Sequence, residues 1–104
     1  MAEELYLSFE RDYYSENKCL IKRKVADLPS FVCAVSSEEH WLKDPQSQSP
    51  WKFDLRVFFE ESRMLVEVSC FTDAFNRDFR GLLSDLSSSC AVRLVDSDHE
   101  PYDW

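Results

Sequence analysis

The chain has 104 residues, of which 44% are hydrophobic and 14% aromatic, and its formal net charge at pH 7 is −8. This length predicts one domain, residues 1–104, and the mixture of large apolar and charged side chains excludes disorder. A strongly acidic chain repels nucleic acid phosphates and anionic lipids. We therefore expect a basic protein partner, with no direct nucleic acid and no membrane binding.

Glycine and cysteine usage narrows the functional class further. The chain has a single glycine, Gly81, whereas the G-x-G-x-x-G and P-loop nucleotide motifs each need more than one, so both are excluded in standard form. The four cysteines are widely spaced and lie in apolar contexts, which favours small buried side chains in a reducing cytosol over disulfides or a zinc site. They are Cys19, Cys33, Cys70 and Cys90.

The N-terminal sequence and the hydropathy pattern indicate where the chain resides. Residues 1–4 are acidic in character and lack the basic-then-apolar pattern of a signal sequence. No apolar run approaches the roughly 20 residues that a membrane-spanning helix needs. We expect a soluble, cytoplasmic protein.

The first quarter of the chain predicts one strand and one ambiguous element. Leu5, Leu7 and Phe9 alternate with less apolar residues, which is typical of a half-buried strand. Residues 15–17 predict a turn, with Asn17 in a left-handed conformation. Residues 18–25 fit either a strand or a short helix that continues to Leu28. We favour a strand that pairs with the first one.

The middle of the chain predicts a strand, an irregular insert and a long hairpin. Residues 31–36 are rich in β-forming residues, while residues 37–51 contain a possible helical turn at 38–42 and a proline-rich loop at 44–50. Residues 53–59 and 64–70 alternate on either side of a polar turn, which predicts an antiparallel hairpin. Three apolar side chains point away from its core face and indicate that part of this second face is either covered or an interface: Phe58, Leu65 and Phe71.

The last third predicts a helix and a strand. Thr72 or Asp73 is a suitable N-cap, and large apolar residues then recur at helical spacing on one stripe: Phe75, Phe79, Leu82, Leu83 and Leu86. Residues 91–95 form a final strand. The order of elements predicts an α+β fold, with an antiparallel β-sheet, one long C-terminal helix packed on one face and a final strand. If residues 10–28 are helical, the alternative is a ferredoxin-like βαββαβ arrangement.

The C-terminal segment carries the best functional clue. Residues 96–104 hold four acids and no Lys or Arg, which is half of the net charge. Three interpretations are a calcium site, a solvated C-terminus and a partner-binding surface. An EF-hand loop needs a glycine where Pro101 stands, and large aromatic residues are unusual in solvating tails, so we favour partner binding. The expected contacts are Asp96, Asp98, Glu100, Tyr102, Asp103 and Trp104, joined by Glu60 and Glu61 at the hairpin turn.

Other constellations have weaker functional interpretations. His40 and His99 each lie beside two acids, which suggests a base or a metal ligand but is common on surfaces. The basic run at 22–24 suggests a small nucleic-acid or phosphate patch, or an edge strand protected by lysines. Trp41 and Trp51 flank the proline-rich loop, where a core role is favoured over a binding role. We predict no catalytic residues, no metal and no cofactor.

Taken together, these features resemble the small acidic immunity proteins of interbacterial toxin systems, contact-dependent or similar. The resemblance covers the whole chain through size, acidity, the lack of an enzyme motif and the acidic, aromatic C-terminal segment, and it includes no shared motif. It implies a cytosolic binding protein that neutralises a cognate toxin, often a basic nuclease. The alternatives are a small regulatory or ligand-binding α+β domain that acts as an oligomer through its second sheet face, and an enzyme that uses His40 or His99.

Overall fold

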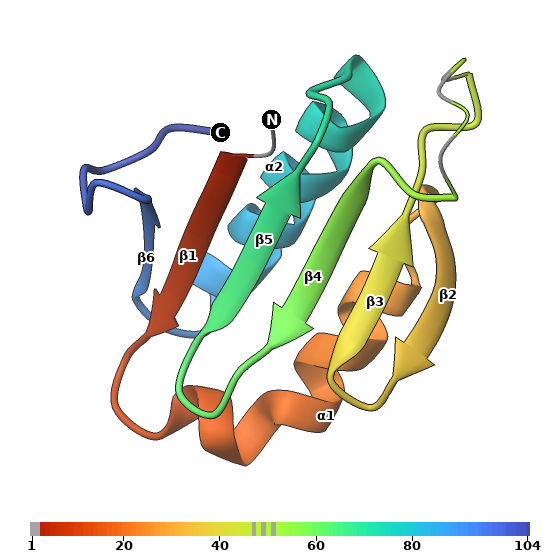
Figure 1. The fold of residues 1–104 in the computed structure, drawn as a ribbon. Coiled ribbons are helices and arrows are strands. Elements are labelled where there is room, and N and C mark those ends of the chain that lie inside the picture. Colours follow the sequence, from red (N-terminus) through yellow and green to blue (C-terminus); the bar gives the residue numbers. More distant parts are fainter. Residues whose placement is uncertain (1–2, 47, 49, 51) are drawn as a thin grey trace.

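A computed structural model of the chain describes residues 3–46, 48, 50 and 52–104. Six strands form one sheet in the order β2-β3-β4-β5-β1-β6, and all neighbouring strands are antiparallel (Figure 1). The strands are β1 (Glu3–Phe9), β2 (Phe31–Ser36), β3 (Glu39–Leu42), β4 (Leu55–Phe59), β5 (Met64–Val68) and β6 (Val92–Asp96). The helices are α1 (Tyr13–Ala26) and α2 (Asp73–Ser87).

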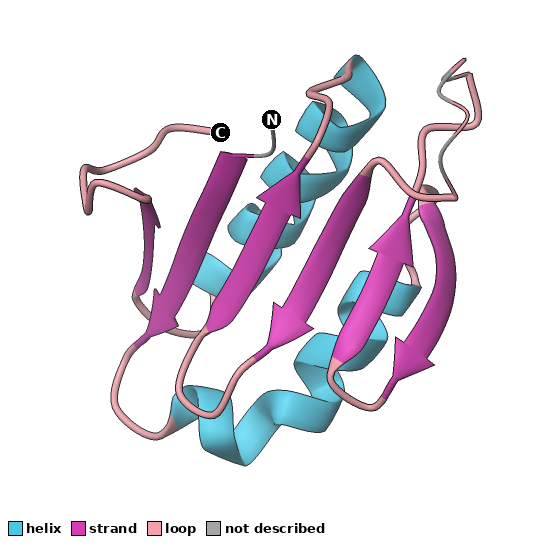
Figure 2. Cartoon of the chain, viewed as in Figure 1, coloured by secondary structure: helices cyan, strands magenta, loops and turns pink. Residues whose placement is uncertain are grey.

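Both helices lie on the same face of the sheet, and the opposite face carries no helix (Figure 2). Alternate residues of the central strands point toward the helices and are fully buried, among them Leu5, Val57 and Val66. Phe75 and Phe79 of α2 and Ile21 of α1 close this core from the other side. The result is a two-layer α+β fold, as the order of elements predicts.

The first helix corrects the sequence interpretation. Residues 18–25 belong to α1 and not to a strand, because Tyr14, Ile21 and Val25 recur at helical spacing and are buried. Asn17 does not take a left-handed conformation. It lies inside α1 with φ −117° and ψ 16°, and its side-chain amide donates to the Tyr13 carbonyl oxygen at 2.9 Å. That side-chain bond accompanies the kink in the helix.

In the middle of the chain the structure confirms the predicted hairpin, but residues 38–42 differ from the prediction. β4 and β5 pair from Leu55 opposite Val68 to Phe59 opposite Met64, as the alternation predicts. Residues 38–42 do not form a helical turn, because Glu39–Leu42 pair on both sides as β3. Their burial alternates, with His40 and Leu42 buried and the other two partly exposed. Trp51 lies outside the described residues.

The second helix and the last strand agree with expectation. The Thr72 hydroxyl oxygen accepts the N–H of Phe75 at 3.3 Å and caps α2, and β6 follows at Val92–Asp96. The topology extends the ferredoxin-like alternative, since a four-stranded meander from β2 to β5 replaces the two-stranded hairpin of a βαββαβ fold. β1 and β6 lie side by side as in that arrangement.

The cysteines differ from expectation. All four are free thiols, and none is fully buried: Cys19 and Cys70 are exposed, and Cys33 and Cys90 are partly exposed. Within the described part of the chain, no helix has the length and apolar character needed to cross a membrane.

Candidate functional site

The C-terminal segment is an ordered strap on the sheet and not a frayed tail. Asp96 closes a tight turn after β6: its carboxylate oxygen Oδ1 accepts the backbone N–H groups of Asp98 and Glu100 at 2.9 and 3.0 Å. His99 has a φ of 63°, a left-handed conformation that the turn requires. The chain then returns along β6, where Pro101 pairs with Val95 and the Tyr102 N–H donates to the Leu94 carbonyl oxygen at 3.0 Å.

Trp104 anchors this strap in the core. Its ring stacks on Phe79 of α2 with centroids 4.5 Å apart and an interplanar angle of 7°. The indole N–H donates to the Asn76 side-chain oxygen at 2.9 Å, and Arg80 Nε donates to the Trp104 carbonyl oxygen at 2.8 Å. The side chain is only 7% exposed, so the expectation that Trp104 is an exposed contact residue is wrong.

Two other aromatic rings surround this anchor and remain accessible. Phe71, in the loop between β5 and α2, is 38% exposed and lies 6.2 Å from Tyr102 and 6.0 Å from Trp104 between ring centroids. Tyr102 is partly exposed, and burial together with the nearby Glu3 carboxylate raises the pKa of its hydroxyl. A shallow groove of about 290 Å³ between α2 and β6 is lined in part by Tyr102 and Asp103.

The acids of this segment lack cationic partners. No ion pair among the described residues uses a carboxylate of Asp96, Asp98, Glu100 or Asp103, and the last three are exposed. Their charge is therefore directed to solvent beside the accessible rings. We call this surface the C-terminal corner and define it by Phe71, Asp96, Asp98, Glu100, Tyr102 and Asp103.

The structure does not bring the hairpin acids to this corner. Glu60 and Glu61 follow β4 at the end of the sheet where β1 finishes, whereas Asp96 lies opposite Leu5 near the start of β1 (Figure 1). Glu60 is also neutralised, because its carboxylate accepts from Arg63 Nε at 2.9 Å. Phe71, expected on the second sheet face, instead belongs to the corner.

The helix-free face of the sheet carries residues that the sequence interpretation missed. Tyr6 and Phe58 both lie opposite Leu65, so the two rings and Leu65 occupy adjacent strands. Arg63 lies over the Tyr6 ring at 4.2 Å, and Arg56 lies over the Phe58 ring at 5.3 Å. The alternation of side chains in β1 and β4 could have assigned Tyr6 and Arg56 to this face. Which residues each of them contacts depends on the order of the strands in the sheet.

Trp41 also lies on this helix-free face. Its indole N–H donates to Glu39, and its ring lies 4.8 Å from that of Phe53 between centroids. It is partly exposed, so it is neither a core residue nor a free binding anchor.

The histidines do not form a shared site. His40 is 6% exposed between the rings of Phe31 and Phe59, and burial, with a contribution from Lys22, lowers its pKa. His99 follows β6, which is four strands from β3, or roughly 19 Å at the usual strand spacing. Among the residues that the structure describes, no group of three or more His, Cys, Asp or Glu side chains is arranged to hold a metal ion.

The basic run at 22–24 is divided among ion pairs on α1 and is not an edge strand. Lys22 Nζ lies 3.4 Å from a Glu38 carboxylate oxygen, and Lys24 pairs with Asp85 of α2 at 2.5 Å. These contacts neutralise two of the three cations, so the run does not present a concentrated phosphate-binding patch.

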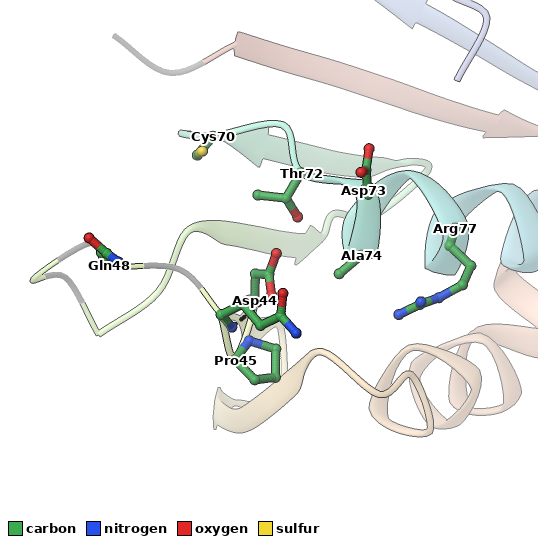
Figure 3. Close-up of a pocket in the computed structure, with 9 residues that line it drawn as sticks. Asp44, Pro45, Gln48, Cys70, Thr72, Asp73, Ala74 and Arg77 are labelled. Carbon is green, nitrogen blue, oxygen red and sulfur yellow. Dashed lines mark hydrogen bonds between the residues drawn. The ribbon is translucent and has the colours of Figure 1, made fainter.

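A groove of about 730 Å³ lies at the start of α2 (Figure 3). Asp44, Asp73 and Arg77 line it, and Arg77 extends from α2 toward the Asp44 side. It is open to solvent, and the N-terminus of the helix is already capped by Thr72. The groove offers charged surface groups of both signs and suggests no specific function.

Comparison with known protein families, with curated proteins and with solved structures gives no match.

Proposed function

We propose that this protein is a binding protein that neutralises a basic protein partner through the C-terminal corner. The class that best fits is an immunity protein that inhibits a cognate bacterial toxin, with a basic nuclease as the expected target. The observation that carries the proposal is the set of unpaired carboxylates around the accessible Phe71 and Tyr102 rings.

Charge and contact area have separate roles in this binding. Unpaired carboxylates attract a basic surface over a range set by ionic strength and accelerate encounter. Aromatic rings at the centre of such a patch supply the contacts that resist dissociation. Trp104 holds the strap on α2, so little chain entropy is lost when a partner binds.

The proposal assigns no reaction to the protein. His40 is enclosed by the rings of Phe31 and Phe59, and His99 follows a strand that is four strands away from it. Inhibition would follow from covering the partner's active site or another surface it needs.

Affinity capture from the lysate of the native host tests the proposal. The immobilised wild-type protein is compared with the variant Asp98→Lys/Glu100→Lys, and Glu61→Lys at the hairpin turn serves as a matched control. We expect a basic protein that the wild type and the control retain at low salt and release at high salt, and that the corner variant does not retain. Equal retention by all three proteins would contradict the assignment to the corner.

An inhibition assay tests the functional half of the proposal. The captured protein is assayed for nuclease activity and for toxicity on expression in a sensitive cell. We expect the wild type to suppress both effects and Asp98→Lys/Glu100→Lys to suppress them much less. A captured protein whose activity is unchanged by saturating wild type would reject neutralisation.

A further inference from the structure

The helix-free side of the sheet, which we call the open sheet face, has an ordered pattern of side chains. Strand register places an apolar stripe across four adjacent strands: Phe58 on β4, Leu65 on β5, Tyr6 on β1 and Val95 on β6. The stripe runs perpendicular to the strands. Phe58, Leu65 and Tyr6 are partly exposed, and Val95 is 8% exposed.

Charges of opposite sign flank this stripe on its two sides. On the side toward the start of β1 lie Glu4 and Glu67, which are opposite each other in the register, and Arg56, which pairs with Glu67. On the side toward the end of β1 lie Arg63, which is stacked over Tyr6 and pairs with Glu60, and Arg93, which is opposite Ser8. Glu4 and Arg93 form no ion pair within the described residues of the chain.

The composition of the open sheet face is that of a protein interface. None of the six strands contains a lysine, and two of the arginines on this face, Arg56 and Arg63, lie over aromatic rings. Interface cores are enriched in aromatic residues and arginine and depleted in lysine. Three arginines, at positions 56, 63 and 93, face four glutamates, at positions 4, 39, 60 and 67, so the net charge of the face is −1 although the chain carries −8.

We propose that the open sheet face binds a second copy of this chain. A two-fold axis along the apolar stripe places the stripe of one copy on that of the other. It also turns the acidic side of each copy onto the basic side of its partner, and Glu4 falls between Arg63 and Arg93 of the second copy. Two chains of charge −8 repel each other elsewhere, and a nearly neutral, self-complementary face is where they can meet.

The geometry and the size of the face are compatible with this pairing. The two-fold axis aligns the strands of the facing sheets, and aligned sheets pack about 10 Å apart. Six strands of about five residues present roughly 400 Å² of flat area per copy at the usual spacings. Such an interface is at the lower end of the known range, so we expect a weak, reversible dimer.

Sedimentation velocity over a concentration series tests the proposal. We expect wild type to shift from monomer to dimer between about 5 and 500 μM, the range of a small, weak interface. Leu65→Asp removes the centre of the stripe and should remain monomeric throughout. Val32→Asp alters a more exposed apolar residue on β2, 48% exposed, and should dimerise as wild type does.

A charge exchange tests the orientation. Glu4→Arg and Arg93→Glu should each weaken the dimer about tenfold, and the double variant should recover to within about threefold of wild type. Circular dichroism checks that each variant is folded. A wild type that stays monomeric to 500 μM would overturn the proposal, as would a double variant that is weaker than both single ones. Neither result bears on the corner, which the capture experiment tests separately.

Discussion

The C-terminal corner and the open sheet face both combine aromatic rings with charged side chains, but they treat charge in opposite ways. On the open sheet face Arg56 pairs with Glu67 and lies over Phe53 and Phe58, and Arg63 pairs with Glu60 and lies over Tyr6. In the corner, Asp98, Glu100 and Asp103 have no ion-pair partner in the described chain. The arrangement of charge therefore separates a surface suited to a copy of itself from one suited to a basic partner.

The largest expected effect comes from removing the anchor of the corner. Trp104→Ala deletes a ring that stacks on Phe79 and should lower the free energy of unfolding by about 3 kcal/mol. Trp104→Phe keeps an aromatic ring but loses the bond to Asn76, and should cost about 1 kcal/mol. Chemical denaturation measures both. An unchanged midpoint for Trp104→Ala would mean that the strap contributes nothing to stability.

Within the open sheet face, the ring contacts of Arg56 can be compared with its ion pair to Glu67. Arg56→Ala should lower the free energy of unfolding by about 1–2 kcal/mol, because it removes ring contacts as well as an ion pair. Glu67→Ala removes only the partly exposed ion pair and should cost less than about 1 kcal/mol. Denaturation below the dimerisation range measures the difference. Equal costs would show that the cation–ring contacts are without energetic effect.

Loss of negative charge should change the stability of the fold in opposite directions at the two surfaces. Asp98→Asn/Glu100→Gln relieves repulsion in the corner and should raise stability by less than about 0.5 kcal/mol at low salt, with no effect at about 1 M salt. Glu67→Gln should lower stability because its cation is then unpaired. Thermal melts at the two salt concentrations test this. A stability loss in the corner variant would indicate unseen cationic partners.

The smallest effect is on the titration of Tyr102. Burial and the Glu3 carboxylate raise the pKa of its hydroxyl, so the fold favours the neutral form. The resulting stability is present below the unfolded pKa of about 10 and is lost as the pH rises through the folded pKa. Glu3→Gln should move the pKa part of the way back, since burial is the larger cause. NMR of ring-labelled tyrosine, assigned with Tyr102→Phe, measures it; an ordinary pKa in the wild type would contradict the burial of this ring.

Strong periodicity made part of the fold predictable. The β4–β5 hairpin alternates without interruption, and α2 repeats large apolar residues at helical spacing, so local pattern and tertiary burial agree. In α1 they do not, because only three side chains are buried and Cys19, which is expected to be buried, is exposed. β3 is a strand because it pairs with β2 and β4, although Glu39 and His40 have little intrinsic β preference.

The candidate site was predictable in composition but not in arrangement. The excess of acids at the end of the chain is visible in the sequence, whereas the stacking of Trp104 on Phe79 joins residues 25 positions apart and follows from the packing of the strap on α2. Phe71 was assigned to the wrong surface because the alternation of β5 ends at Val68. That Glu60 lies far from the corner could be recognised only from the directions of the strands in the sheet.

The central claim is that a basic partner contacts the C-terminal corner and leaves the open sheet face free. The most direct measurement is the amide NMR footprint of the isotope-labelled protein, recorded below its dimerisation range with the captured basic protein. The account predicts that perturbed signals cluster at Phe71 and residues 96–103, while Tyr6, Phe58 and Leu65 are unchanged. A footprint centred on those three residues, with the corner unaffected, would contradict it.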